Sequence, residues 1–160
     1  MSRLLTLLVS IPIACAALSG CGQVVFGGRT DSPSAMAMAN HAQVKEALDQ
    51  LIAAYEAKDI RRFSSLVSER YTGEGGILDT AVRRDFSSYH NLTIRYTVNN
   101  ITLDSDGGKA FAAITYTRGW TDIKTSRTRS ETGETTLVFI RENGAYRLYS
   151  QNRPVLFGRN

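Results

Sequence analysis

The hydrophobic period of this chain changes from helical to extended near Leu92. Before this residue, apolar side chains recur at spacings of three and four, which is typical of amphipathic helices. After it, apolar residues such as Leu92, Ile94, Tyr96 and Val98 alternate with polar ones, which indicates strands. Because no helical segment separates the strands, they must pair as an antiparallel meander with the helices grouped on one face. The pattern predicts an α+β domain.

Three helices are predicted before the change of period. The first begins at Asn40, where Gln43 has the spacing of a capping box, and runs for about four turns. Asp59 is the expected cap of a shorter second helix. Residues 73–76 are glycine-rich and predict a loop, and residues 77–89 predict the third helix.

Four strands are predicted after it. The first, residues 92–103, slips in phase at Asn99 and Asn100, which predicts a bulge that curves the sheet. Residues 110–123 and 132–141 predict the second and third strands. The Asn143-Gly144 pair predicts a two-residue hairpin turn into the last strand, residues 146–151.

The first 20 residues are typical of a secretory signal peptide. Arg3 precedes an apolar stretch, residues 4–18, that is shorter than the roughly 20 residues of a membrane-spanning helix. Its end, Leu18-Ser19-Gly20-Cys21, resembles the lipobox of bacterial lipoproteins. The resemblance implies that residues 1–20 are removed and that Cys21 is acylated. The alternative is an ordinary signal peptide in which Cys21 is incidental.

Acylation of Cys21 would anchor the protein to a membrane. Cys15 lies in the removed segment, so no disulfide remains possible within the mature chain. Gly22, in place of an Asp that retains lipoproteins in the inner membrane, is compatible with the outer membrane of a Gram-negative cell, facing the periplasm. Residues 21–39 have no period and predict a flexible tether, and residues 40–160 form the predicted domain.

The order of elements resembles the nuclear-transport-factor-2-like superfamily, which includes SnoaL-like and ketosteroid-isomerase-like domains. Residues 53–63 (AAYEAKDIRRF) are similar to its helix-to-helix junction, and residues 144–148 and 154–158 are similar to its closing segments. The resemblance covers about residues 40–158. It implies a cone-shaped, cystatin-like fold in which three helices pack on a curved sheet. Because the superfamily includes isomerases, dehydratases and domains that only bind, the fold does not choose an activity.

The catalytic residues of the superfamily's enzymes do not carry over. Leu51 stands where ketosteroid isomerases place an oxyanion-binding Tyr, and their general-base position falls near Gly75, beside Glu74. The weak acid and base candidates are His90, at the helix-to-strand junction, and Glu74. His41 and His90 are too far apart for a metal motif, and no cofactor fingerprint is present. We therefore expect no metal and no cofactor.

Two features predict binding. Five aromatic residues are candidates to line a cavity for a small apolar ligand, with core packing as the alternative: Tyr55, Tyr89, Tyr96, Tyr116 and Trp120. Residues 118–129 are basic and predict a solvated hairpin, with contact to anionic lipid headgroups, cell wall or a partner as the alternative. The formal net charge of +4 is modest, and without a stacking motif it gives no reason to expect nucleic-acid binding.

The sequence thus predicts an envelope lipoprotein whose domain binds a small apolar ligand or a protein partner without catalysis. A homodimer through the sheet face would compete with a protein partner for the same surface. The alternative is a small isomerase or dehydratase with His90 and Glu74 as its acid and base.

Overall fold

The computed structural model describes residues 33–72 and 75–159. These residues belong to one compact unit. The predicted signal peptide, Cys21 and Glu74 lie outside the described residues, as does most of the predicted tether. Within the described ranges, none of the helices has both the length and the apolar character needed to cross a membrane.

Three helices come first, as predicted: α1 (Pro33–Glu56), α2 (Ile60–Ser65) and α3 (Gly75–Ser88). Asp59 caps α2, since its Oδ1 accepts a hydrogen bond from the backbone N of Arg62 at 3.0 Å. Helix α1 begins at Pro33 and not at Asn40, so residues 33–39 of the predicted tether are helical. A proline is well suited to a first helical position, and alanine and methionine extend a helix readily.

Asn40 and Gln43, the predicted cap, lie within α1 and have a different role. Their side-chain oxygens both accept hydrogen bonds from the guanidinium of Arg141, at 2.8 and 2.6 Å. The pair therefore joins α1 to the sheet.

The sheet is an antiparallel meander in the order β1-β2-β3-β4, formed by Tyr89–Leu103, Lys109–Asp122, Thr128–Glu142 and Ala145–Gln151. The predicted bulge is present as a register shift between Val98 and Asn100. Asn143 and Gly144 both have positive φ, 52° and 82°, as the predicted hairpin turn requires. The third strand begins four residues earlier than predicted, because residues 128–131 pair with the end of β2.

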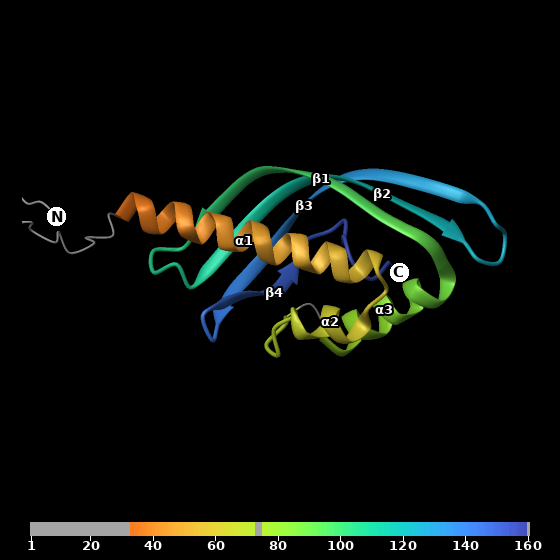
Figure 1. The fold of residues 1–160 in the computed structure, drawn as a ribbon, viewed down its shortest axis with the longest axis horizontal. Helices are drawn as coiled ribbons and strands as arrows, with labels where there is room; N and C mark the ends of the chain where they lie inside the picture. The colour runs from red at the N-terminus through yellow and green to blue at the C-terminus, as the bar shows by residue number, and fades with distance from the viewer. Residues whose placement is uncertain (1–32, 73–74, 160) are drawn as a thin grey trace, which may run out of the picture. The chain divides into compact units, whose positions relative to one another are not determined.

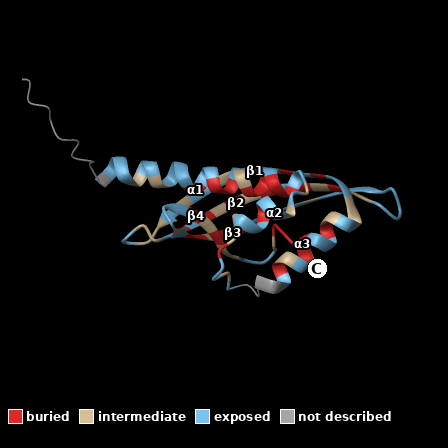
Figure 2. Ribbon diagram, turned by 60° about the horizontal axis from the view of Figure 1, so that its bottom comes forward, coloured by how far each residue is buried: buried red, intermediate tan, exposed pale blue. Residues whose placement is uncertain are grey.

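The helices cover one face of the sheet, and the core lies between the two layers (Figure 1). The buried side of α1 is confined to its second half, since residues 34–43 include no buried residue and burial starts at Val44 (Figure 2). None of the three described helices lies over the opposite face of the sheet.

The C-terminal segment, residues 152–159, turns back from β4 into the core. Leu156 and Phe157 are both fully buried. The ring of Phe157 makes edge contacts with Tyr55 and Phe63, at centroid distances of 5.3 and 5.2 Å. This segment occupies the space between the helices and the sheet in which the sequence predicted a ligand cavity.

Candidate functional site

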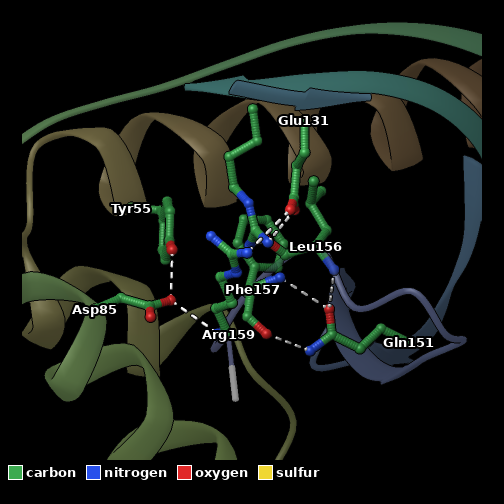
Figure 3. Close-up of polar contacts among 8 residues, drawn as sticks. Tyr55, Asp85, Glu131, Gln151, Leu156, Phe157 and Arg159 are labelled. Atoms are coloured by element: carbon green, nitrogen blue, oxygen red, sulfur yellow. Dashed lines mark hydrogen bonds and ion pairs between the residues drawn. The ribbon is translucent and has the colours of Figure 1, made fainter. Parts of the chain in front are cut away.

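A buried polar cluster lies where the helices, the sheet and the C-terminal segment meet (Figure 3). We call it the interior cluster, and its members come from α1, α3, β2, β3 and the C-terminal segment: Tyr55, Asp85, Arg118, Glu131 and Arg159. Asp85 follows Ala81 and Val82 on the inner face of α3, and Arg118 alternates with Tyr116 and Trp120 on the inner face of β2. Helical and strand periodicity therefore direct these polar side chains inward.

Tyr55 and Asp85 form the most enclosed pair of the cluster. The Tyr55 hydroxyl donates to Oδ2 of Asp85 at 2.6 Å, and both residues are only 1% exposed. Oδ2 also accepts the backbone N–H of Arg159 at 2.9 Å. Burial raises the pKa of Asp85, although these hydrogen bonds and the charge of Arg118 oppose the shift. Burial and the neighbouring carboxyl of Asp85 also raise the pKa of Tyr55, so its hydroxyl remains a donor.

Arg118 is a buried cation, 3% exposed. One terminal nitrogen donates to the carbonyl oxygen of Leu156 at 2.5 Å, and the other forms a short ion pair with Glu131. The Nε atom is buried and has no hydrogen-bond partner. Glu131 is 31% exposed, so the ion pair connects the interior to the surface.

Arg159 closes the cluster on the solvent side. Its guanidinium lies over the ring of Trp120 at 4.2 Å from the centroid and 3.5 Å from the second carboxylate oxygen of Glu131. Trp120 and Glu131 thus contact both arginines. Arg118 also lies near the Trp120 ring, at 5.9 Å from its centroid, and pairs with Glu131.

Gln151 holds the C-terminal segment in place at its other end (Figure 3). Its side-chain oxygen accepts the backbone N–H groups of Leu156 and Phe157 at 3.0 and 3.1 Å. Its side-chain nitrogen donates to the carbonyl of Phe157 at 2.8 Å. Backbone groups that would otherwise be buried without partners are therefore satisfied by one amide.

The aromatic candidates are placed in different surroundings. Tyr55, Tyr116 and Trp120 are buried among core residues. Tyr89 is half-buried and packs against Trp120 at a centroid distance of 5.9 Å. Tyr96 is half-buried, and its hydroxyl forms a short hydrogen bond with Asp49. The structure therefore does not bring the five together around one cavity.

His90, the acid or base candidate that the structure describes, is not part of the interior cluster. His90 is exposed at the start of β1, where it pairs in the sheet with Thr121. Glu74 lies outside the described residues. Among the residues that the structure describes, no group of three His, Cys, Asp or Glu side chains is placed to hold a metal ion.

The structure buries Arg118, although the sequence predicted that it lies in a solvated basic hairpin. It lies on the inward-facing side of β2 because its position continues the alternation of Ile114 and Tyr116. The in-phase spacing was a signal for this placement, but the positive charge argued against burial. Asp85 carried a similar signal, since it stands three and four residues after the inward-facing Val82 and Ala81.

Two surface hollows lie outside the interior cluster. One, of about 450 Å³, lies between α1 and β1 and is lined by residues that include Lys45, Asp49, Tyr96, Val98 and Ile101. The other, of about 390 Å³, lies by α2 and α3, over Phe63, Val67 and Leu78. Of the predicted ligand-binding residues, Tyr96 is the one that lines either of these two hollows.

The outer face of the sheet is rich in small hydroxyl side chains. Directly paired residues on this face include Thr117 with Thr132 and Thr121 with Thr128, whose hydroxyl oxygens are 3.1 Å apart in each pair. Near one end the face becomes apolar, where Phe111, 40% exposed, pairs with Val138.

No known protein family and no curated protein matches this chain by sequence. Solved structures do match it. A conserved protein from Planctomyces limnophilus aligns with a TM-score of 0.63 and 15% identity, over 71% of this chain and 94% of the other. A putative scytalone dehydratase from Novosphingobium aromaticivorans aligns with a TM-score of 0.64 and 8% identity, over 74% and 85%. A ketosteroid isomerase-like protein from Erwinia carotovora atroseptica aligns with a TM-score of 0.59 and 12% identity, over 69% and 91%.

These likenesses define the class of fold. The chain has the nuclear-transport-factor-2-like, α+β fold, as the sequence predicted. The structures that share it include isomerase-like and dehydratase proteins as well as proteins whose names state no activity, so the fold leaves binding and catalysis both open.

Proposed function

We propose that this protein is a non-catalytic binding domain of the cell envelope, held at the membrane by an acylated Cys21. The observation that carries the proposal is that the chain's own C-terminal segment fills the interior of the cone. Leu156 and Phe157 are fully buried there. Most polar groups around them, including Tyr55 and Asp85, already have partners within the chain. A substrate would have to displace this segment before it reached these groups.

The outer face of the sheet is the surface that we propose for a protein partner. Hydroxyl side chains such as Thr117 and Thr132 are short, so another surface can approach the strands closely. The exposed Phe111 adds an aromatic side chain of the kind that is enriched in protein interfaces. A second copy of the chain is the competing occupant of the same face.

A photo-crosslinking residue at Thr117, in the full chain and in the cells that produce it, tests this contact. We expect a covalent adduct whose mass identifies either a different protein or a second copy. The matched control places the same residue at Arg61, which is exposed on α2. Adducts formed equally from both positions, or from neither, would contradict the proposed surface.

The lipid anchor has a separate test. Replacement Cys21→Ser should abolish incorporation of labelled fatty acid, and a high-salt wash should then move the protein from the membrane fraction to the soluble fraction. Cys15→Ser is the matched control, because Cys15 lies within the predicted signal peptide and should leave labelling intact. Acyl labelling that persists in Cys21→Ser would overturn this part of the proposal.

A small apolar ligand is a second candidate for what the domain binds. The hollow between α1 and β1 has a volume of about 450 Å³, within the usual range of ligand pockets, and Val98 and Ile101 contribute apolar surface to it. A fluorescent apolar probe should bind there, and Val98→Asp should abolish its binding. If Val67→Asp in the other hollow abolishes binding instead, the ligand site is by α2 and α3.

Catalysis of the isomerase or dehydratase type is favoured by one observation, the raised pKa of the buried Asp85 beside the Tyr55 hydroxyl. Asp85 is a better base candidate than His90 because it lies in the interior. The test is deuterium exchange at the α-carbon of a cyclic ketone, measured by NMR. Exchange that is lost in Asp85→Asn and kept in His90→Asn would support an enzyme, and no exchange would argue for binding alone.

A further inference from the structure

The hairpin that joins β2 to β3 extends beyond the helices, at the opposite end of the sheet from the start of α1 (Figure 1). We call residues 122–129 the hairpin tip. Its turn is closed by backbone hydrogen bonds from Asp122 to Arg127 and from Ser126 to Asp122, both at 2.9 Å. The backbone N–H of Ile123 donates to the carbonyl of Ser88 at 2.9 Å, which fixes the tip to the end of α3. The tip is therefore an ordered projection.

The cations of the tip are exposed, and no acidic side chain in the described part of the chain pairs with them. These cations are Lys124, Arg127 and Arg129. Elsewhere on the surface, Lys45 pairs with Asp49 and Arg83 with Asp79, at 2.7 and 2.6 Å. Other exposed arginines of the described residues also have no ion pair, so what distinguishes the tip is that its three cations lie together on one projection.

The single acidic residue of the tip, Asp122, accepts hydrogen bonds within the turn. Oδ1 of Asp122 accepts the backbone N–H groups of Lys124 and Thr125 at 2.9 and 2.8 Å and the hydroxyl of Thr125 at 3.1 Å. These hydrogen bonds, with the nearby charge of Arg129, keep the pKa of Asp122 below its usual value. Three cations and one carboxylate leave the tip with a net charge of +2.

An apolar side chain stands among these charges. Ile123 is 39% exposed, directly before Lys124. A soluble polyanion would gain little from an isoleucine, because it offers no apolar layer. A bilayer offers both anionic headgroups for the cations and a hydrocarbon boundary for Ile123.

From this combination we propose that the hairpin tip docks onto an anionic membrane surface, with Lys124, Arg127 and Arg129 at the phosphate headgroups and Ile123 at the boundary below them. The proposal does not depend on acylation at Cys21. Because the core of the described residues lies between Val44 and Phe157, a chain of residues 31–160 retains all of the described helices and strands and lacks the apolar N-terminal segment.

The test is co-sedimentation of residues 31–160 with vesicles of phosphatidylcholine alone and of phosphatidylcholine with about one third phosphatidylglycerol. Binding should require phosphatidylglycerol and should weaken as salt rises, since ions screen exposed charges. The triple replacement Lys124→Gln, Arg127→Gln and Arg129→Gln should reduce binding about 100-fold, from the usual contribution of a basic side chain near a charged bilayer. Ile123→Ser should also weaken binding.

The matched control removes three exposed cations from other surfaces, with Arg61→Gln, Arg62→Gln and Arg153→Gln. It has the same net charge as the first variant, and all six positions are exposed, so both variants should keep the native circular dichroism spectrum. Equal loss of binding in the two variants would overturn the proposal, as would equal binding to both kinds of vesicle. Tighter binding to soluble heparin, unaffected by Ile123→Ser, would show that the tip binds a soluble polyanion and not a membrane.

Discussion

The hydroxyl of Tyr55 donates a hydrogen bond to Asp85 at 2.6 Å across 30 residues of sequence, with both side chains buried. This bond joins α1 to α3 within the core. The backbone N–H of Arg159 uses the same carboxylate oxygen, so the bond also supports the C-terminal segment. The Asp85 carboxylate therefore holds α1, α3 and the C-terminal segment together.

Tyr55→Phe should lower the free energy of unfolding by about 1–3 kcal/mol, because the carboxylate of Asp85 loses one of its donors inside the protein. Urea unfolding at neutral pH measures the loss. Tyr149→Phe is the matched control, since no hydrogen bond of the Tyr149 hydroxyl is found among the described residues, and it should cost little. Equal costs for the two replacements would mean that the Tyr55 bond contributes nothing specific.

The raised pKa of Asp85 predicts a pH dependence of stability. A carboxyl whose pKa is higher in the folded state holds its proton longer there than in the unfolded chain. Stability from this group is therefore fully present below the unfolded pKa and is lost as the pH rises through the folded pKa.

Replacement Asp85→Asn should remove this loss, so the difference in stability between wild type and variant should shift in favour of the variant as the pH rises from about 3 to about 8. Urea unfolding across this range measures the shift. The hydrogen bond from Tyr55 can still be accepted by the amide oxygen of asparagine. A difference that is independent of pH would show that Asp85 titrates as it does in the unfolded chain.

We expect the replacement of Glu131 to lower the free energy of unfolding more than the replacement of its ion-pair partner Arg118. Glu131→Gln leaves a buried guanidinium without its counter-ion and should cost about 3 kcal/mol. Arg118→Met removes the buried charge, keeps the apolar stem, and leaves Glu131 partly exposed beside Arg159, so it should cost about 1–2 kcal/mol. Urea denaturation of both variants checks the order, and a greater loss for Arg118→Met would refute it.

Periodicity and short motifs predicted the order of helices and strands because these signals are local. The alternation of Leu92 and Ile94, the cap at Asp59 and the turn at Asn143 each depend on a few neighbouring residues, and the structure confirms all three. The start of α1 was predicted wrongly for the same reason. Asn40 has the local spacing of a cap, but its partner is Arg141, about a hundred residues away.

The interior cluster could not be predicted in the same way. Asp85 and Arg118 occupy inward positions of α3 and β2, but charged residues are seldom buried unless they are paired, and their partners come from distant parts of the chain. The insertion of Leu156 and Phe157 depends on Gln151 and Arg118 together, which no pattern of spacing connects. A prediction of these contacts needs the folded chain.

The C-terminal segment gives the last prediction. Phe157→Ala should lower the free energy of unfolding by about 3–5 kcal/mol, because it leaves a cavity beside Tyr55 and Phe63. Trp120 is the only tryptophan, and Arg159 lies over its ring, so tryptophan fluorescence reports whether the segment stays in place. We expect the emission of the variant to match that of wild type and the new cavity to bind a small apolar molecule such as benzene, measured by calorimetry. Leu103→Ala, which shortens a half-buried side chain at the far end of β1, is the control and should bind none. A red-shifted emission without benzene binding would mean that the segment leaves the core, and that Phe157 is what holds it there.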